Sequence, residues 1–374
     1  MTSILAASAA LDSWIERHEF RGWDPHDGLN SPILRALSFG NRYAGIVWLQ
    51  LVKRSPINTR RLLLVPKGYN PKAMGLFLAS YQRKGDPERT RFFADWLEKN
   101  AAPGYHGAAW GYNFDWPNRD FFARRGTPTI VNTAFIGLAF LDLDGDLAER
   151  GGSVARSACE FLLRDLNRQA PAKDELCFSY TPIDTRQVHN ANVLGAWLLA
   201  ETWKRAGGDE LADTALAAAR FTARRQRPDG MWLYGENPRD SWIDNFHTAY
   251  VLVALRRIGA ALGTSEFDSV IARGFESWKT SMITAEGIPK YYADRLYPID
   301  AHCVAQSILT FLEFEDVAQA AKIARWAVAN MQERDGHFDY QLLKHYRIRI
   351  PYMRWCQAWM QRALTELTMR PGIG

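Results

Sequence analysis

Apolar and polar positions along the chain define two kinds of helical segment. The first kind is apolar almost all round, as in AYVLVAL at 249–255 and AQSILTFL at 305–312. A helix that is apolar on every face is buried, so these runs predict inner helices. The second kind is alanine-rich, with apolar residues at i, i+3 and i+4 and a charged opposite face. These amphipathic segments predict outer helices at 152–168, 209–227, 266–282 and 316–332.

The inner segments recur with a regular period. Five polar residues mark their starts, at separations of 58, 55, 55 and 54 residues: Asn132, Asn190, Asn245, Asp300 and Arg354. Each start follows a polar loop with an aromatic pair: Trp110/Tyr112, Phe178/Tyr180, Trp232/Tyr234, Tyr291/Tyr292 and Phe338/Tyr340. A period of about 55 residues fits two helices of about 15 residues and a long loop.

The first third of the chain is less regular, and we expect its inner helices to start near Asn30 and Asn70. No run of alternating β-branched residues competes with the helical interpretation. Long polar loops precede the inner helices on one rim, which favours a closed ring over an open solenoid. The sequence therefore predicts one all-α domain over 1–374, an (α/α)6 toroid of helical hairpins or a seven-hairpin variant of it.

Two Asp-Gly segments carry a resemblance to known families. RRQRPDGMW at 224–232 and NMQERDGHF at 330–338 resemble the Q-x-x-D-G-x-W repeat of terpene cyclases and protein prenyltransferases. They also resemble the Asp-Gly turns of six-hairpin glycosidases, polysaccharide lyases and sugar epimerases, and this resemblance implies an α/α toroid. With GWDPHDGLNS, FSYTPID, VHNAN and DNFHTAY, the whole chain is similar to uncharacterised toroid proteins encoded in bacterial exopolysaccharide clusters. That second resemblance implies no particular mechanism.

Charge and cysteine usage narrow the class of partner. The net charge is +5 and the pI is about 9.0, which favours an acidic partner. Lysine and arginine are spread along the chain, so nucleic acid is not expected. The four cysteines form no C-x-x-C pair and are expected to be buried thiols. We expect neither a signal peptide nor a transmembrane segment, and hence a cytoplasmic protein of undetermined oligomeric state.

The rim where inner helices begin is the predicted site, because unpaired N–H groups and the positive helix dipole favour an anionic or polyhydroxyl ligand there. Three histidines start successive inner helices at separations of 58 and 55, which predicts a shared cavity. The predicted catalytic residues are His189, His247, His302, Asp244 and Tyr180. The predicted substrate-binding residues are Asn132, Asn190, Asn192, Asn245, Asp300, Arg354, Trp355, Trp110, Tyr112, Trp232, Tyr292 and Asp27. A simple helix cap is an equally consistent interpretation for four of these residues: Asn132, Asn190, Asp244 and Asp300.

A metal site is the competing interpretation of the same rim. His247, Asp300 and His302 match the residue types of a two-histidine, one-carboxylate site. DNFHTAY also resembles the stretch around the zinc-binding histidine of protein prenyltransferases, but Asp300-Ala-His302 departs from their Asp-x-Cys pattern and the chain order is reversed. The prediction is therefore a site without metal or cofactor.

These residue types favour an enzyme that acts on an acidic, uronate-containing polysaccharide or its lipid-linked repeat unit. Lyase or C5-epimerase chemistry needs a base for the proton α to the carboxylate and cationic groups for the developing charge, and the rim supplies both. One alternative is an inverting glycoside hydrolase that uses Asp244 and Asp300. Others are an isoprenoid cyclase or transferase, whose acidic motifs are missing, and a non-catalytic glycan-binding protein of polysaccharide biosynthesis.

Overall fold

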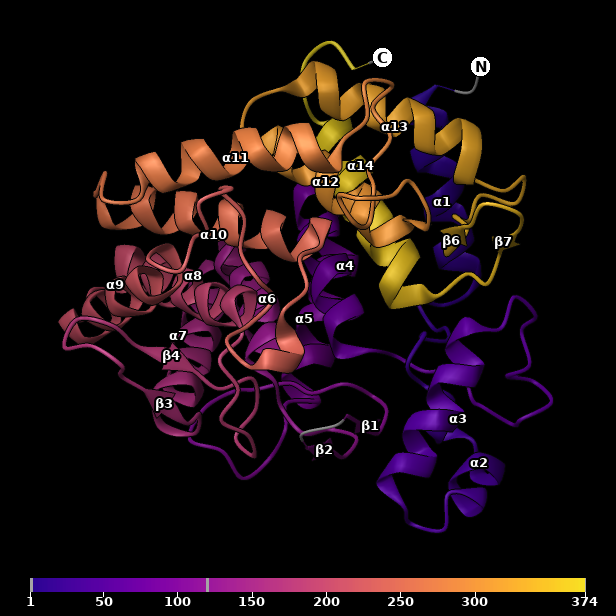
Figure 1. Ribbon diagram of the computed structural model, residues 1–374, viewed down its shortest axis with the longest axis horizontal. Helices are drawn as coiled ribbons and strands as arrows, with labels where there is room; N and C mark the ends of the chain where they lie inside the picture. The colour runs from indigo at the N-terminus through magenta and orange to yellow at the C-terminus, as the bar shows by residue number, and fades with distance from the viewer. Residues whose placement is uncertain (1–2, 119–120, 374) are drawn as a thin grey trace.

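The computed structural model describes residues 3–118 and 121–373. Six helices form an inner wall in which each contacts the next (Figure 1). They are α4 (Pro71–Lys84), α6 (Ile130–Leu141), α8 (His189–Ala206), α10 (Asn245–Leu262), α12 (Ala301–Glu313) and α14 (Trp359–Thr368). The wall closes on itself because α14 packs against α4. The predicted all-α toroid of helical hairpins is confirmed.

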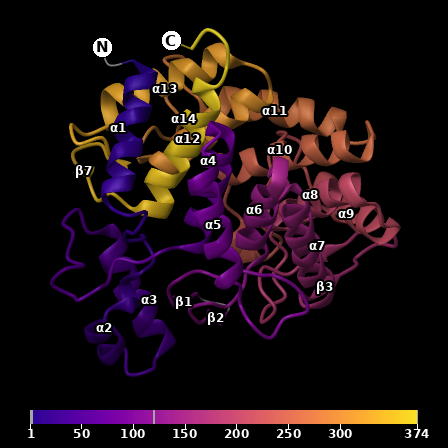
Figure 2. The same cartoon turned by 180° about the vertical axis from the view of Figure 1, so that it is seen from behind.

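An outer helix covers each inner helix. The outer helices are α5 (Pro87–Lys99), α7 (Ala148–Arg164), α9 (Asp209–Ala223), α11 (Asp268–Met282), α13 (Val317–Met331) and α1 (Ile4–Arg17). The sixth hairpin joins the two ends of the chain, since α1 packs against α14 (Figure 2). The Gln361 side chain donates a 2.7 Å hydrogen bond to Asp12 across this pair.

Polar caps set the start of several inner helices. Side chains of Asn70, Asp244 and Asp300 each accept a hydrogen bond from a backbone N–H of the first turn, which satisfies one of the four unpaired donors there.

Short antiparallel strands brace the loops: β1 (Trp116–Pro117), β2 (Phe122–Ala123), β3 (Arg168–Gln169), β4 (Cys177–Phe178), β5 (Ile299–Asp300), β6 (Gln341–Leu342) and β7 (Arg347–Ile348). Short 3-10 turns occur at Gly145–Leu147 (η2) and Pro238–Asp240 (η3), and a π-helical turn, Met353–Ala358 (η4), leads into α14.

The repeated Q-x-x-D-G segments join neighbouring outer helices. The Gln226 amide donates to Gly230 O of its own turn and to Val270 O of α11, at 2.9 and 2.8 Å. In the second copy, the Gln332 amide donates to Gly336 O at 3.0 Å and to Ala7 O of α1 at 2.8 Å. Gly336 has a φ of +106°, where a Cβ would meet a backbone oxygen of α1 at 2.2 Å. The motif is therefore a structural clamp in this chain.

The prediction of an inner helix that starts near Asn30 is wrong. Residues Gly28–Asn30 form the short turn η1, followed by α2 (Pro32–Leu37) and α3 (Arg42–Arg54). These helices pack around a small cluster of their own, Leu29, Leu34 and Val52, and stand apart from the ring of helices (Figures 1 and 2). The ring therefore has six hairpins, and 28–67 is an insertion between α1 and α4, called here the excursion.

The four cysteines are free and buried, as predicted. Burial raises the pKa of each thiol. Within residues 3–118 and 121–373, no helix has the length and apolar character needed to cross a bilayer.

Candidate active site

A cavity of about 480 Å³ opens where the inner helices begin. Its lining follows one rule: the second residue of every inner helix faces it, with the π-helical turn η4 taking the place of α14. These residues are Lys72, Val131, Asn190, Phe246, His302 and Arg354. Convergence of six helix starts brings their positive dipole ends around one space, which favours an anionic ligand.

Asp244 and His247 form a dyad in this cavity. Asp244 caps α10, and its Oδ2 lies 2.7 Å from Nδ1 of His247. The Trp242 indole also donates to that carboxylate, at 3.2 Å. A carboxylate only accepts hydrogen bonds, so the Nδ1 atom carries a proton and Nε2 is the nitrogen left to act on a ligand. The geometry is that of a base held by an orienting carboxylate.

His302 and Tyr250 form a second pair, from the adjacent helices α12 and α10. The Tyr250 hydroxyl lies 2.6 Å from Nε2 of His302. Burial, followed by the nearby charges of Lys72 and Arg354, holds the pKa of His302 well below its usual range. Burial also raises the pKa of Tyr250 well above its usual range. The pair is therefore a neutral imidazole next to a protonated phenol, which suits proton donation.

Lys72 places a buried amine in the wall of the cavity, and sequence analysis missed it. Its Nζ atom lies over three aromatic rings, 4.3 Å from the centroid of Phe135, 5.2 Å from Trp359 and 5.8 Å from Tyr250. Burial, reinforced by the charge of Arg354, lowers the pKa of this amine well below its usual range. The sequence did contain a signal for Lys72, because it is the second residue of the helix that begins at Pro71 after the Asn70 cap.

Arg354 is held by a buried ion pair with the early GWDPHDG segment. Its Nε and Nη2 atoms lie 2.6 and 2.8 Å from the two carboxylate oxygens of Asp24. Burial alone would raise the pKa of Asp24, but the Arg354 charge and the hydrogen bonds from His26 and Arg354 hold it below its usual range. Gly22 lets this segment approach, since a Cβ there would lie 2.5 Å from the Cβ of Met353.

His26 and Lys53 lie together on one side of the cavity. Nζ of Lys53 lies 3.0 Å from Nε2 of His26, and both residues line the space. Burial, then the Lys53 charge, lowers the pKa of His26 to about 4. Burial lowers the pKa of Lys53 to about 8, opposed by Asp300 and Asp24.

Aromatic side chains make up much of the remaining wall. They are Tyr112, Phe114, Trp116, Tyr180, Tyr234, Trp242, Phe246, Tyr291, Tyr292 and Trp355. Tyr112 stacks on Phe114 with centroids 5.0 Å apart, and Trp242 stacks on Tyr234 at 4.5 Å. Such faces with polar edges suit sugar rings. Of the predicted residues, Asn190, Tyr112, Tyr180, Tyr292, Trp355 and Arg354 share this cavity with Asp244, His247 and His302.

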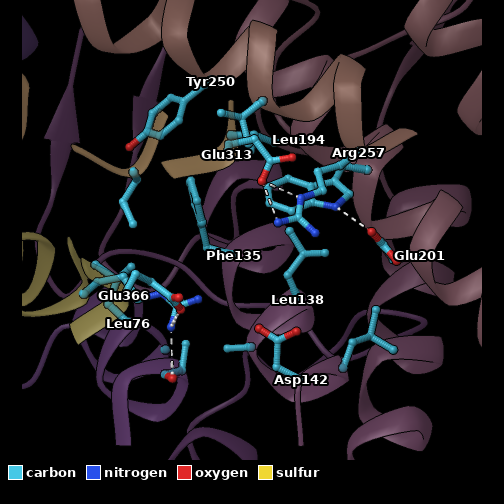
Figure 3. Close-up of a pocket in the computed structure, with 18 of the residues that line it drawn as sticks. Leu76, Phe135, Leu138, Asp142, Leu194, Glu201, Tyr250, Arg257, Glu313 and Glu366 are labelled. Atoms are coloured by element: carbon cyan, nitrogen blue, oxygen red, sulfur yellow. Dashed lines mark hydrogen bonds and ion pairs between the residues drawn. The ribbon is translucent and has the colours of Figure 1, made fainter. Parts of the chain in front are cut away.

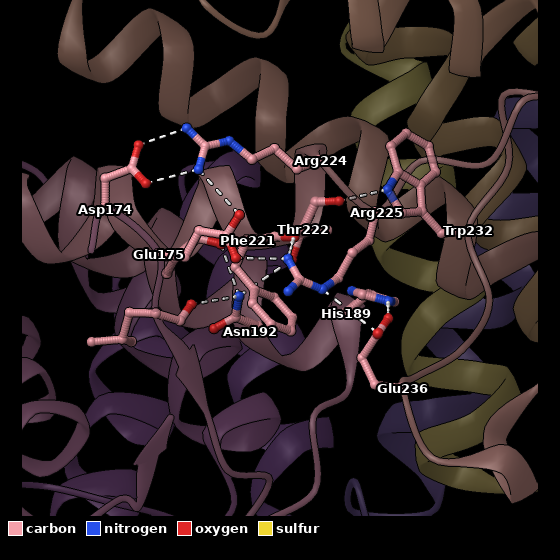
Figure 4. Close-up of polar contacts among 12 residues, drawn as sticks. Asp174, Glu175, His189, Asn192, Phe221, Thr222, Arg224, Arg225, Trp232 and Glu236 are labelled. Atoms are coloured by element: carbon pink, nitrogen blue, oxygen red, sulfur yellow. Dashed lines mark hydrogen bonds and ion pairs between the residues drawn. The ribbon is translucent and has the colours of Figure 1, made fainter. Parts of the chain in front are cut away.

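His189 does not line this cavity. Its Nε2 atom pairs with Glu236 at 2.8 Å, and Glu236 also pairs with Arg225 (Figure 4). His189 is the first residue of α8, whereas His302 is the second residue of α12 and His247 the third of α10. Each residue turns about 100° around a helix, so histidines at nearly regular spacings in the sequence point in different directions in space.

Several other predicted binding residues support the loops instead. The Asn192 amide accepts from Phe178 N at 3.0 Å and donates to Ala218 O at 2.8 Å. The Asn245 amide donates to Lys290 O at 2.9 Å. The Trp110 and Trp232 indoles donate to Leu97 O and Thr222 O within the core. Asn132 is buried outside the cavity, and neither polar atom of its side chain has a partner within the described residues.

Two predicted carboxylates also lie outside the cavity. Asp300 is fully buried, and its oxygens accept from the Trp355 indole at 2.9 Å and the Gln341 amide at 2.7 Å. Burial raises the pKa of Asp300 to about 6. Asp27 pairs with buried Arg60 at 2.7 Å. Asp300 and Asp27 therefore hold neighbouring side chains in place from outside the cavity. Among the described residues, no group of three or more His, Cys, Asp or Glu has the arrangement of a metal site.

A second cavity, of about 290 Å³, lies at the opposite ends of the inner helices (Figure 3). Its rim carries charged residues, including Glu201, Arg257, Glu313 and Glu366. Tyr250 lines both cavities. Tyr250, Phe135 and Trp359 contact one another with centroids 5.2–5.8 Å apart, so these three rings form a floor between the two spaces.

Comparison with known proteins identifies the fold. Neither a protein-family model nor a curated protein sequence matches this chain. Among solved structures, the cellobiose 2-epimerase of Bacillus thermoamylovorans aligns with a TM-score of 0.62 at 9% identity, over 81% of this chain and 89% of that one. A D-mannose isomerase aligns with 0.60 at 11% identity, over 80% and 86%. A family 76 glycoside hydrolase from a bovine Bacteroides thetaiotaomicron strain aligns with 0.57 at 12% identity, over 80% and 68%. The chain therefore has the α/α-toroid fold that these sugar epimerases, isomerase and glycoside hydrolases share.

Proposed function

We propose that this protein is a carbohydrate-active enzyme that moves protons on an acidic, uronate-containing glycan by lyase or C5-epimerase chemistry. The observation that carries the proposal is the pair of imidazoles in one cavity, His247 oriented by Asp244 and His302 beside Tyr250. A volume of about 480 Å³ is typical of small-molecule sites. The sugar epimerases and isomerase of the same fold support sugar chemistry on this scaffold.

In this mechanism Nε2 of His247 removes the C5 proton, which the neighbouring carboxylate makes acidic. The electron pair of the C–H bond moves into an enolate-like carboxylate, and Lys72 stabilises that charge. A bound carboxylate favours the protonated form of the Lys72 amine. Lys72 forms no ion pair within the described residues, so its amine is available to the substrate carboxylate.

The lyase and the epimerase differ in the fate of this electron pair. In the lyase, the electron pair forms a C4–C5 double bond, the C4–O bond breaks, and the Tyr250 hydroxyl gives its proton to the leaving oxygen. In the epimerase, the same hydroxyl returns a proton to the opposite face of C5. The proton that His247 has taken up then returns to the Tyr250 oxygen through solvent, while His302 holds that oxygen in place at 2.6 Å. The substrate is a polysaccharide or its lipid-linked repeat unit, with exopolysaccharide biosynthesis as the setting.

The alternatives have less support. An inverting hydrolase needs two carboxylates across the scissile bond, and Asp300 is enclosed by Trp355 and Gln341 outside the cavity. Asp240 does line the cavity with Asp244, but it is paired with Arg186. An isoprenoid cyclase would need an acidic motif that the sequence lacks. A protein that only binds glycans would not need the two proton-transfer pairs, Asp244–His247 and Tyr250–His302.

The test is to incubate the enzyme with uronate-containing polysaccharides and measure three signals. New ultraviolet absorbance from an unsaturated ring indicates a lyase. Deuterium entering C5 from heavy water, without that absorbance, indicates an epimerase. New reducing ends with neither signal, lost in Asp244→Asn but kept in His247→Ala, would overturn the proposal in favour of a hydrolase.

A further inference from the structure

The excursion concentrates exposed apolar side chains. Nine of the seventeen exposed large apolar residues in the described part of the chain lie within 33–64: Ile33, Leu37, Phe39, Tyr43, Val47, Leu51, Ile57, Leu62 and Leu64. Phe39, Leu62 and Ile57 are 88%, 80% and 72% exposed. Single exposed apolar residues are ordinary, but such a concentration in one segment marks an interaction surface.

Helix α3 shows how this surface is organised. Tyr43, Val47 and Leu51 are spaced four residues apart, so they form one exposed stripe along the helix. Another face buries Leu49 and Val52, and Val52 packs with Leu29 and Leu34 of the excursion itself. The folded chain therefore buries one apolar face of α3 and leaves the apolar stripe at 43, 47 and 51 exposed.

The charge of the segment identifies the partner. No acidic residue occurs between Asp27 and Asp86, although ten lysines and arginines do. Within the excursion, Arg35, Arg54, Arg61 and Lys67 are exposed among the apolar side chains. Apolar residues interspersed with basic ones, with no carboxylate, are the composition that binds the interface of an anionic bilayer.

A second copy of this chain fits the surface less well. A symmetric dimer through the excursion would bring its exposed arginines and lysine against their own copies, with no carboxylate in the segment to neutralise them. We propose that the excursion, 28–67, docks this protein peripherally on an anionic lipid surface.

This docking has a consequence for the cavity. The helix that carries the apolar stripe also places Gln50 and Lys53 in the cavity wall. Docking would therefore hold the cavity near the lipid headgroups. The further step, that the substrate is the lipid-linked form of the glycan, rests on the proposed function, whereas docking itself does not.

The experiment is vesicle flotation of the full chain, which measures binding without activity. We expect flotation with vesicles of phosphatidylcholine and phosphatidylglycerol, and little with phosphatidylcholine alone. Phe39→Ser/Leu62→Ser and Arg54→Ser/Arg61→Ser should each weaken binding by about tenfold or more. The matched control, Tyr346→Ser/Met369→Ser, removes exposed apolar residues outside the excursion and should bind as wild type.

Three outcomes would overturn the proposal. One is a wild-type protein that floats with neither vesicle. Another is flotation that is the same in the excursion variants and the control. The third is a dimer in sedimentation velocity that Phe39→Ser/Leu62→Ser dissociates, which would assign the surface to a second copy. All substituted residues are exposed, so circular dichroism of the variants should match the wild type.

Discussion

The Nζ atom of Lys72 lies 4.3 Å from the ring centroid of Phe135, on the aromatic floor that separates the two cavities. The amine has no carboxylate partner within residues 3–118 and 121–373. A buried cation is costly unless something compensates it, and aromatic faces compensate it only in part. Perturbed groups of this kind concentrate in functional sites. Lys72 is therefore a residue at which stability and the proposed function are opposed.

Lys72→Met should raise stability and lower activity. Burial lowers the pKa of Lys72 in the folded protein below its unfolded value of 10.5. At pH values between the folded and the unfolded pKa, the unfolded chain therefore binds more protons than the folded one. The advantage of methionine is therefore largest below the folded pKa and shrinks as pH rises toward 10.5. Thermal melts over a pH series measure this difference in stability, and each kcal/mol corresponds to a shift in Tm of about 2–4 °C.

In the same variant kcat/KM on a uronate substrate should fall, because the stabilising charge is gone. Lys344→Met, at an exposed lysine, is the control and should change neither quantity. A Lys72→Met enzyme with wild-type kcat/KM would remove Lys72 from the mechanism.

His247→Ala should lower kcat by about 10²–10⁴-fold, the usual contribution of a positioned general base. Asp244→Asn should also lower kcat, since it removes the carboxylate that orients the imidazole, yet asparagine still caps α10. His345→Ala, at an exposed histidine outside the cavity, is the matched control. Steady-state kinetics with unchanged circular dichroism would separate a catalytic loss from unfolding, and a fully active His247→Ala would contradict the mechanism.

The fold could be predicted because buried and half-buried helices leave different patterns. Residues 249–255 of α10 are apolar almost all round and those of α9 on one side only, which defined an inner and an outer helix. The excursion was misassigned for the same reason. Its helix α3 is rich in apolar residues, as an inner helix would be, but those at 43, 47 and 51 face outward. A sequence pattern shows that a face is apolar, and it does not show which partner covers that face.

The site could be predicted only to the level of the rim. Helix starts were found from their caps, and the direction of each side chain then depended on its phase within the first turn. His302 at the second position faces the cavity, and His189 at the first does not. Asp24 and Arg354 are separated by 330 residues, so no local pattern could pair them.

His26 should make folding stability depend on pH in weakly acidic solution. Burial and the Lys53 charge lower its pKa from 6.5 to about 4, so between these values the unfolded chain binds a proton that the folded chain excludes. Stability from this group therefore rises with pH from about 4 to 6.5 and is lost on acidification. His26→Gln should reduce the rise in unfolding free energy across that window by about 3 kcal/mol, measured by urea denaturation at a series of pH values. An unchanged slope would show that His26 is protonated in the folded protein.

The buried Asp24–Arg354 pair should be strongly coupled. Asp24→Asn or Arg354→Met alone leaves an uncompensated charge in the core, which costs about 3–5 kcal/mol. The double variant leaves no charge, so its loss should be smaller than the sum of the single losses by about 1–3 kcal/mol in urea denaturation. The exposed pair Arg220–Glu266 is the control: its side chains are 27% and 36% accessible, and its coupling should stay below about 1 kcal/mol. Strictly additive losses at Asp24 and Arg354 would mean that each residue is held by other neighbours. Coupling would show instead that the early GWDPHDG segment and the last inner helix depend on one another to close the wall of the cavity.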